Sequence, residues 1–420
     1  MIYYSLYDRM LSYDNLLKAF KRVKAPKGAP GIDGQTIDAF AKNLESNLTM
    51  LIHELKTKQY RPQPVKRVEM TKTGGGIRKL GIPSVRDRVV QQALKKILEP
   101  IFDPDFHPSS YGYRPGRSCH HAITKAQMFI RKYELKWVVD MDLSKCFDTL
   151  DHEIIIRSIK KRVTDGSILN LVRMFLTSGV MENGNWQASA EGSPQGGVIS
   201  PLIANIYIDA FDQFMMKRGH RIVRYADDIL ILKRSRTAAE NVCEIATNYL
   251  EDTLKLTVNQ QKTHIAMGFK GVKFLGVVIH TRHTSIQESK VKGFKDKVKK
   301  ITCRTSPVNL EKVIKDLNPV IRGFANYFRI ATCNKVFEQL SGWIRRRLRA
   351  KQLALWKKPG RLHRRLRQMG YKGNFLKIRM RSWRNSISPY ANYSLPNEWF
   401  DQLGLFDISK VQTGISVPLI

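Results

Sequence analysis

Residues 221–233 (RIVRYADDILILK) place two adjacent carboxylates between two apolar segments. The apolar segments predict two short β-strands that meet at Ala226, Asp227 and Asp228. Neighbouring carboxylates repel each other, so they favour solvent or a bound cation. Taken alone, this tip is explained by a solvated turn at least as well as by a divalent-metal site, because aspartate is a frequent turn residue.

A second acidic strand changes this balance. Residues 137–143 (WVVDMDL) predict a strand whose period-two alternation places Asp140 and Asp142 on one face. That face could simply be solvated, as one face of many antiparallel sheets is. Two acidic strands in one core are more consistent with a pair of Mg²⁺ ions about 3.5–4 Å apart, held by carboxylates for phosphoryl transfer.

The surrounding segments predict an α+β fold with mostly antiparallel pairing. Apolar residues recur at helical spacing over residues 85–102 and 199–210. Residues 61–80 alternate around residues 74–76 (GGG), which predicts a basic β-hairpin. Residues 272–280 (VKFLGVVIH) predict one further strand.

Two turns could contact phosphates. Lys72 and Arg78 flank the glycine turn of the hairpin, and arginine binds phosphate bidentately whereas lysine binds it as a point charge. Gln195 lies in residues 192–197 (GSPQGG), a turn that opens a helix. Each turn by itself is explained better by a structural role, because glycine-rich turns are common.

The charge balance predicts a polyanionic partner. Among 420 residues there are 72 Lys and Arg against 36 Asp and Glu, a formal net charge of +36. RNA or DNA is the leading candidate. An anionic membrane is the alternative, but no apolar run approaches the roughly 18–20 residues that span a bilayer, so we expect no membrane partner. The five cysteines form no CxxC pair, so we expect no zinc and a reducing compartment.

Positive charge is concentrated near the C-terminus. Residues 339–397 contain sixteen Lys or Arg and no acidic residue. The densest cluster of basic residues consists of Arg345, Arg346, Arg347 and Arg349. Trp343 and other aromatic residues lie among the basic residues of this region. Cations beside aromatic faces are typical of nucleic-acid grooves. A charge run is usually a solvated face, but an uncompensated field of this extent favours nucleic-acid binding.

Taken in order, several motifs resemble those of group II intron-encoded reverse transcriptases, also called maturases, and most nearly the compact bacterial, class C-like kind without an endonuclease domain. The motifs are residues 28–34 (GAPGIDG), 60–83, 111–117 (YGYRPGR), 138–151 (VVDMDLSKCFDTLD), 193–205 (SPQGGVISPLIAN), 224–228 (RYADD), 256–262 (LTVNQQK) and 274–276 (FLG). Each motif is weak alone, but their order along nearly the whole chain is specific.

The resemblance implies a right-hand polymerase fold with fingers, a palm built on an antiparallel sheet, and a helical thumb. The expected parts are an N-terminal extension and loop (1–60), fingers and palm (61–285), a thumb or domain X (286–361) and a basic DNA-binding-like segment (362–420). It implies an RNA-directed DNA polymerase, a nucleotidyltransferase that uses two Mg²⁺ ions, with Mn²⁺ as a substitute.

The resemblance also assigns the metal site residue by residue. Asp142, Asp227 and Asp228 match the catalytic aspartates that bind the two metal ions. Leu143 would add its backbone carbonyl to the ligands. Asp140, on the same face as Asp142, is the alternative acid.

The substrate contacts follow from the same resemblance. Phe147 matches the aromatic gate that would clash with a ribose 2′-OH and so select dNTPs. Four further residues match dNTP contacts: Lys72, Arg78, Gln195 and Lys262. The last of these would donate a proton to pyrophosphate. Arg114 matches a residue near the templating base.

Residues 322–329 (RGFANYFR) and 343–349 (WIRRRLR) resemble the part of the family that binds intron RNA and assists splicing. The expected partners are therefore group II intron RNA, an RNA template with a DNA primer, target DNA and dNTPs. The sequence has no HNH endonuclease with cysteine pairs, which favours priming from a nascent DNA strand during retrohoming. Without an Arg/Ser-rich leader, a bacterial cytoplasm, with association with the nucleoid, is expected.

Two other interpretations remain open at the level of the sequence. One is an RNA-binding splicing factor with a vestigial polymerase site, against which the intact aspartates and Phe147 argue. The other is a domesticated reverse transcriptase that serves host defence or DNA repair. The thumb motifs favour the maturase, and a ribozyme intron in the flanking DNA would discriminate between the two.

Overall fold

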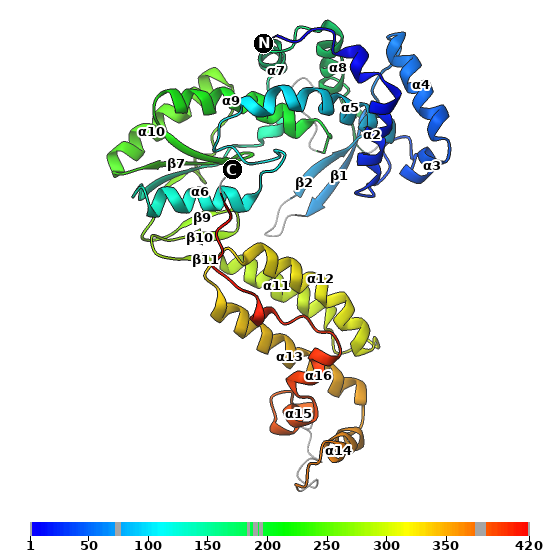
Figure 1. Cartoon of the computed structure of the whole chain (residues 1–420), viewed down its shortest axis with the longest axis vertical. Helices are drawn as coiled ribbons and strands as arrows, with labels where there is room; N and C mark the ends of the chain where they lie inside the picture. Colours follow the sequence, from blue (N-terminus) through cyan, green and yellow to red (C-terminus); the bar gives the residue numbers. More distant parts are fainter. Residues whose placement is uncertain are drawn as a thin grey trace. The chain divides into compact units, whose positions relative to one another are not determined.

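The computed structural model describes residues 2–71, 77–182, 185–187, 192, 196–373 and 384–418, without the side chains of Arg78, Asn185 and Trp186. Contacts divide the chain into two compact units, Met1–Gly268 and Phe269–Pro418. Figure 1 follows the chain through both units. Each unit is described by itself.

The first unit is a mixed helix and sheet domain. Its helices are α1 (Tyr7–Met10), α2 (Tyr13–Lys24), α3 (Ile37–Lys42), α4 (Leu44–Lys56), α5 (Val85–Phe102), α6 (Cys119–Arg131), α7 (His152–Lys160), α8 (Gly166–Leu176), α9 (Ser200–Lys217) and α10 (Arg236–Asn248), with short turns η1 (Asp103–Asp105), η2 (Cys146–Asp148) and η3 (Tyr249–Thr253). Its strands are β1 (Val65–Thr71), β2 (Ile77–Ile82), β3 (Trp137–Met141), β4 (Val180–Glu182), β5 (Asn185–Gln187), β6 (Arg221–Tyr225), β7 (Asp228–Lys233) and β8 (His264–Met267).

The second unit is mainly helical. Its strands are β9 (Val272–Phe274), β10 (Val277–Ile279) and β11 (Thr284–Ile286). Its helices are α11 (Glu288–Ile301), α12 (Leu310–Phe328), α13 (Asn334–Trp356), α14 (Pro359–Gln368), α15 (Pro389–Ser394) and α16 (Asn397–Gln402), followed by the turn η6 (Ile408–Lys410).

An antiparallel sheet of order β6-β7-β3-β8 organises the first unit. Strands β6 and β7 form a hairpin in which Tyr225 lies opposite Asp228. The acidic strand β3 is next to β7 and places Asp140 opposite Leu230. On its other side β3 pairs with β8, where His264 lies opposite Asp140. The predicted hairpin and the predicted acidic strand are therefore confirmed, and they are neighbours in one sheet.

Helices cover both faces of this sheet. Helix α10 packs on β3 and β7, and helices α6 and α9 pack on β6. Figure 1 shows α9 and α10 above the strands and α6 below them. Val139 and Met141 on β3 and Ile229 on β7 are fully buried. Burial of each such side chain contributes about 1.5–3 kcal/mol, so the apolar residues of the two acidic strands fix their positions.

The basic hairpin predicted over residues 61–80 is strands β1 and β2. Its register places Lys66 opposite Ile82 and Thr71 opposite Ile77. Strand β1 also pairs in parallel with β4, and β5 completes a sheet of order β2-β1-β4-β5. This hairpin approaches the turn before α9, because a Cβ added to Gly196 would lie 2.2 Å from the carbonyl oxygen of Gly81.

The single strand predicted over residues 272–280 is wrong. The segment forms two strands, β9 and β10, in which Val277 pairs back with Phe274. Between them Leu275 and Gly276 have φ angles of 45° and 84°. Leucine rarely adopts this left-handed conformation. The continuous apolar sequence therefore predicted one strand where the chain turns.

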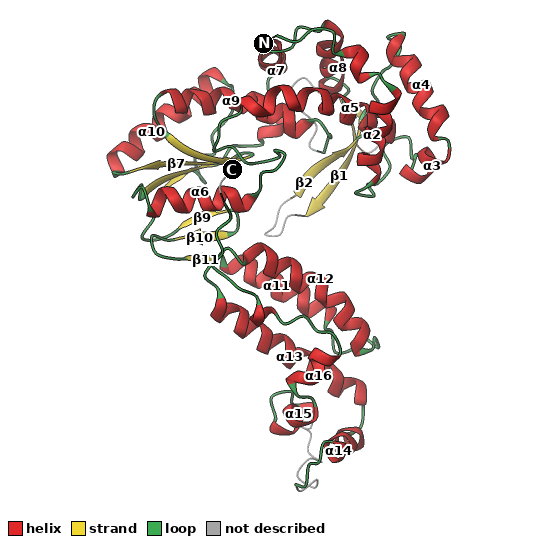
Figure 2. Ribbon diagram, in the orientation of Figure 1, coloured by secondary structure: helices red, strands yellow, loops and turns green. Residues whose placement is uncertain are grey.

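Helices α11, α12 and α13 form the body of the second unit. They are the long helices that lie alongside one another in Figure 2. The rings of Phe294 on α11 and Phe324 on α12 stack with centroids 4.2 Å apart. Among the described residues, none of the helices combines the length and the apolar character needed to cross a membrane.

The boundary between the two units falls after Gly268. Strands β9–β11 therefore belong to the same compact unit as the helices that follow them, whereas the sequence placed residues up to 285 with the palm. The finer division into residues 1–60, 61–285, 286–361 and 362–420 remains a prediction.

Gly112 provides a test of how tightly the β6–β7 tip is packed. A Cβ at Gly112 would lie 2.3 Å from the backbone nitrogen of Ala226. We expect Gly112→Ala to lower the free energy of unfolding by about 1–3 kcal/mol through overpacking, measured by urea denaturation. Gly166→Ala is the control, because nothing lies within 4 Å of a Cβ at Gly166. Equal stability of the two variants would show that the tip is loosely packed.

Candidate active site

The Asp227–Asp228 pair is carried by a very tight turn. Ala226 adopts a φ of 58°, a left-handed conformation that reverses the chain between β6 and β7. The turn rests on the backbone of Gly112, which leaves no space for a side chain there. The backbone nitrogen of Tyr111 also donates to the carbonyl of Arg224 over 2.9 Å. The loop before α6 therefore supports the turn that presents the two aspartates.

A buried polar network holds the same turn from inside. Arg224 on β6 and Asp212 on α9 are both fully buried, and Arg224 Nη2 lies 2.6 Å from Asp212 Oδ2. Arg224 Nη1 donates to Asn205 Oδ1 and to the carbonyl of Ala226, each over 3.0 Å. Asn205 in turn donates from Nδ2 to the carbonyl of Gly112 over 2.8 Å. One guanidinium thus links α9, the turn and its supporting loop.

The first predicted metal ligand, Asp142, directly follows the last residue of β3. Its carbonyl accepts a hydrogen bond from Asn259 over 2.8 Å, and the backbone nitrogen of Ser144 donates to Thr257 over 2.9 Å. Leu143 lies between these bonds, opposite Val258. In such an antiparallel pair the backbone groups of the middle residue point away from the partner strand. The Leu143 carbonyl is therefore directed away from Val258.

Four carboxylates share one electrostatic environment. Burial, and to a smaller extent the charges of Asp227, Asp140 and Asp142, raise the pKa of Asp228 to about 7. Burial is also the main cause that raises the pKa of Asp140 to about 6; His264 lowers this pKa and Asp142 raises it. The Asp228 side chain still meets solvent, so its energetic penalty is partly screened. These effects show that the acidic residues of β3 and the hairpin tip lie close together.

A lysine and a histidine border the carboxylates. Lys262 Nζ lies 2.9 Å from Asp142 Oδ2. His264 Nε2 lies 3.9 Å from Asp140 Oδ2. Lys262 was predicted as a dNTP contact, and the structure places its ammonium group at the first metal ligand. His264 has no predicted role.

The donor set fits a hard divalent cation. Within the described ranges, no group of three or more His, Cys, Asp or Glu residues is arranged as a ready metal site. Carboxylates and a backbone carbonyl are nevertheless the ligands that Mg²⁺ prefers, and Mg²⁺ usually keeps waters or binds substrate phosphates as well. Burial and the neighbouring carboxylates raise the pKa values of Asp140 and Asp228, so both side chains ionise more readily beside a positive charge. A divalent cation would supply that charge.

Phe147 lies on the turn η2 that follows Asp142. Its side chain is 9% exposed, and its ring meets the edge of the Tyr113 ring at a centroid distance of 6.4 Å. Lys145 begins the turn with a φ of 48°. A Cβ at Gly192 would lie 2.6 Å from the carbonyl of Asp148. The ring therefore contacts Tyr113, and the backbone of the turn that carries it is closely packed against Gly192.

Three predicted dNTP contacts are not visible in this arrangement. Lys72 and Gln195 lie outside the described residues, and so does the side chain of Arg78. The backbone of Arg78 is described, and it pairs with Met70 in the β1–β2 hairpin. The roles of these three residues remain predictions.

The structure gives Arg114 a different environment from the predicted one. The Arg114 side chain is 3% exposed, and its Nε lies 2.7 Å from Asp103 Oδ1. Its other guanidinium nitrogens donate to the carbonyls of Asp103, His107 and Ser110. A guanidinium so buried and so fully bonded shapes the loop before α6 and is not free to contact a templating base. The prediction of template binding is therefore corrected to a structural role.

The four clustered arginines of α13 differ in their surroundings. Arg345 is buried and forms ion pairs with Asp401 and Asp407, each over 3.0 Å. Arg349 is buried and donates to the carbonyl of Leu395 over 2.8 Å. These two residues anchor the C-terminal segment, so their predicted nucleic-acid contacts are corrected. Arg346 is exposed and Arg347 is half-buried, so both remain candidates for binding.

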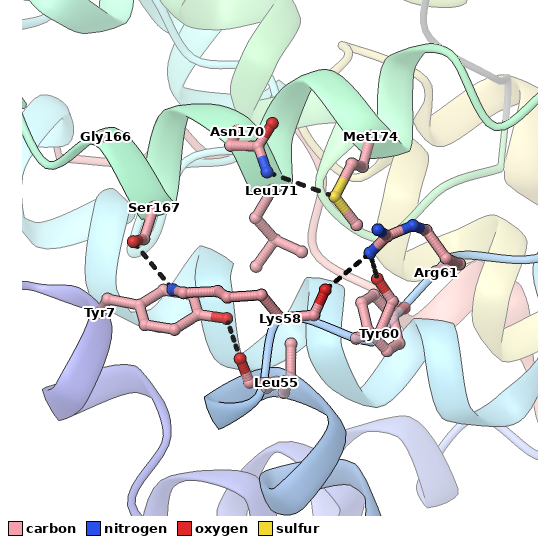
Figure 3. A pocket seen from close by; sticks show the side chains of 10 residues that line it. All are labelled: Tyr7, Leu55, Lys58, Tyr60, Arg61, Gly166, Ser167, Asn170, Leu171 and Met174. Atoms are coloured by element: carbon pink, nitrogen blue, oxygen red, sulfur yellow. Dashed lines mark hydrogen bonds between the residues drawn. The ribbon is translucent and has the colours of Figure 1, made fainter.

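A cavity of about 490 Å³ lies apart from the carboxylates, among α1, α4 and α8 (Figure 3). Lys58 Nζ donates to Ser167 Oγ over 2.9 Å and lies 3.5 Å from the centroid of the Tyr7 ring. The Tyr7 hydroxyl donates to the carbonyl of Leu55 over 2.8 Å. Arg61 donates to the carbonyls of Lys58 and Tyr60. These polar groups are used to dock the N-terminal segment on α8.

Sequence reasoning missed the residues that support the site. Asp212 lies among the apolar residues of the buried helix α9, and Arg224 follows the buried Ile222 and Val223 of β6. Opposite charges on two elements rich in apolar residues are a signal for an ion pair, because a buried charge requires a partner. Asn205 was part of a recognised motif but received no role.

The acidic antiparallel sheet, flanked by a hairpin and helices, defines a polymerase-type palm. A family model described as "Reverse transcriptase (RNA-dependent DNA polymerase)" matches residues 70–279. A second, described as "Group II intron, maturase-specific domain", matches residues 291–370. The chain therefore belongs to the reverse transcriptase family and carries a group II intron maturase-specific domain, which confirms the resemblance and the right-hand α+β fold.

Curated relatives agree with this assignment. Protein YkfC of Escherichia coli (strain K12) is 35% identical over 300 residues, which cover 62% of this chain and 79% of that protein. Group II intron-encoded protein LtrA of Lactococcus lactis subsp. cremoris is 29% identical over 351 residues, which cover 67% of this chain and 58% of LtrA. A chain of a solved partial Cas6-RT-Cas1–Cas2 complex is 22% identical with a TM-score of 0.37, covering 59% of this chain and 42% of that chain.

The raised pKa of Asp228 predicts a pH-dependent effect on stability. An acid whose pKa is raised on folding destabilises the protein as pH rises from its unfolded value of 3.8 to its folded value of about 7. Asp228→Asn removes this penalty. In EDTA, we expect the variant to melt at a higher temperature than the wild type at pH 8 and at the same temperature near pH 4, measured by circular dichroism. The same difference at both pH values would contradict the electrostatic explanation.

Proposed function

We propose that this chain polymerises DNA on an RNA template through Asp142, Asp227 and Asp228. The convergence of acidic residues from β3 and the β6–β7 tip carries this proposal: burial, together with the charges of Asp227, Asp140 and Asp142, raises the pKa of Asp228 to about 7. The match of residues 70–279 to reverse transcriptases supplies the reaction class. Asp140 would contribute to the field of the site as its alternative acid.

The three aspartates and the Leu143 carbonyl would hold two Mg²⁺ ions, with Mn²⁺ as a substitute. When bound, such ions activate the primer 3′-OH and stabilise the departing pyrophosphate. Lys262, at 2.9 Å from Asp142, would neutralise charge in the empty site and donate a proton to the leaving group. The buried Arg224–Asp212 pair would keep Asp227 and Asp228 in place during these steps.

The dNTP pocket would be completed by residues on three segments. Phe147 would exclude a ribose 2′-OH, and its packing against Tyr113 would keep the ring from moving aside. Lys72, Arg78 and Gln195 would contact the triphosphate and the nucleotide.

The second unit would bind group II intron RNA and assist splicing. This proposal is supported by the maturase-specific match over residues 291–370 and by the uncompensated basic composition of residues 339–397. Target DNA, the RNA template and a DNA primer would be the other partners, and retrohoming the biological process. A bacterial cytoplasm is the proposed location.

Asp227→Ala tests the polymerase site. We expect loss of primer extension with dNTPs and Mg²⁺ on an RNA template, because a metal ligand is removed, and nearly unchanged affinity for the same RNA. Gel-based extension and filter binding measure the two properties. Glu153→Ala is the control, because Glu153 lies on the surface in an exposed pair with Arg173. Extension that survives in Asp227→Ala would refute the assignment, and no wild-type extension with tight RNA binding would favour the splicing-factor interpretation.

Phe147→Ala tests the sugar gate. Removing the ring opens space for a 2′-OH, so we expect the ratio of kcat/KM for dNTPs over NTPs to fall by about tenfold or more. Phe147→Tyr keeps an aromatic ring at the position and should retain the preference. An unchanged ratio in a folded Phe147→Ala variant would show that selection lies elsewhere.

A further inference from the structure

Two side chains outside the acidic site bond to the backbone on either side of the predicted dNTP contact Gln195. Residues 192–199, the Gln195 loop, lead into α9. Within this loop residues 193–195 lie outside the described residues, whereas Gly192 and residues 196–199 are described. His152 bonds to the first of these flanks and Gln91 to the second.

The first flank of the Gln195 loop is bonded to the segment that follows Phe147. The backbone nitrogen of Gly192 donates to the carbonyl of Leu150 over 2.9 Å. His152 Nε2 lies 2.8 Å from the carbonyl oxygen of Gly192. A carbonyl oxygen can only accept a hydrogen bond, so His152 Nε2 is the donor. Both backbone polar groups of the buried Gly192 therefore have partners.

The second flank of the loop is bonded to α5 and lies against the β1–β2 hairpin. The amide oxygen of Gln91 accepts a hydrogen bond from the backbone nitrogen of Val198 over 2.7 Å. Gly196 has a φ of 117°, a conformation that favours glycine. The carbonyl of Gly81 on β2 leaves no space for a side chain at Gly196. The two flanks therefore contact different parts of the predicted dNTP pocket.

Both side chains extend from helices. His152 is the first residue of α7, and Asp151 caps this helix by accepting a hydrogen bond from the backbone nitrogen of Ile154 over 2.8 Å. Gln91 lies within α5 and is 6% exposed. Supporting groups on helices define the geometry of a site more precisely than groups on loops do. Each flank of the Gln195 loop is therefore bonded to a side chain whose own backbone belongs to a helix.

We propose that His152 and Gln91 are positioning residues for dNTP binding. The inference rests on the proposed function, in which Gln195 contacts the incoming nucleotide. Each of the two hydrogen bonds holds one flank of the Gln195 loop, between the Phe147 turn and the β1–β2 hairpin, and neither side chain contacts the nucleotide itself. Removing either side chain leaves a backbone group of the loop to find another partner. A small displacement of a positioning contact is enough to weaken productive binding.

The test is steady-state incorporation of one dNTP by the full chain on an RNA template with a DNA primer and Mg²⁺. Gln91→Met and His152→Leu each replace one hydrogen-bonding group by an apolar one. Gln92→Met is the matched control, because Gln92 is also buried on α5 but projects about 100° away from Gln91 around the helix. His152→Gln is the rescue variant, since its amide nitrogen can donate to Gly192 in place of Nε2. Circular dichroism melting checks folding.

We expect Gln91→Met and His152→Leu each to raise the KM for the dNTP about three- to tenfold, the effect of one lost hydrogen bond. The value of kcat should change by less than about twofold, because the change affects binding and not the chemical step. Gln92→Met and His152→Gln should keep the wild-type KM. Gln195→Ala should raise KM by itself, and adding Gln91→Met to it should raise KM no further, because both changes act on the same contact.

The other outcomes separate this inference from the proposed function. An unchanged KM in folded Gln91→Met, or a fall in kcat alone, would overturn the inference and leave the polymerase activity standing. So would an equal rise in KM in Gln92→Met, or effects of Gln91→Met and Gln195→Ala that multiply. If His152→Leu does not fold, Gln91→Met decides the question. Wild-type protein that extends no primer would overturn the proposed function and this inference with it.

Discussion

The Arg224–Asp212 ion pair is fully buried beneath the turn that carries the aspartates. Removing one member of such a pair typically costs about 3–5 kcal/mol, because the other charge is left without a partner in a low-dielectric core. Here the pair does more than join two elements. Arg224 also bonds to the carbonyl of Ala226 and to Asn205, which holds the carbonyl of Gly112. One hydrogen-bonded network therefore joins the turn, the loop that supports it and α9.

A rigid turn matters because the carboxylates it presents repel each other. Asp227 and Asp228 face Asp140 and Asp142 on β3, and their charges raise the pKa of Asp228. In a flexible site these side chains would separate into solvent, whereas the buried network keeps them converged until cations bind.

The sequence predicted the elements whose signal is local. Alternation and helical spacing identified the β6–β7 hairpin, strand β3 and helix α5, and the ordered motifs identified the family. What it could not predict depended on partners distant in the chain. The sequence predicted Arg114 and Arg345 to be available for nucleic acid, but in the structure they form ion pairs with Asp103 and Asp407. The charge of a residue does not by itself reveal a partner that is distant in the chain. The turn at Leu275 was missed because its left-handed conformation contradicts the residue's preference.

The central claim is that the acidic residues of β3 and of the β6–β7 turn form one site for two metal ions. Anomalous diffraction from crystals soaked in Mn²⁺, with a primer–template and a dNTP, tests this claim most directly. The account predicts Mn²⁺ peaks bound by Asp142, Asp227 and Asp228, with the Leu143 carbonyl as a further ligand. Peaks bound elsewhere, or none at these aspartates while the dNTP is in place, would contradict it.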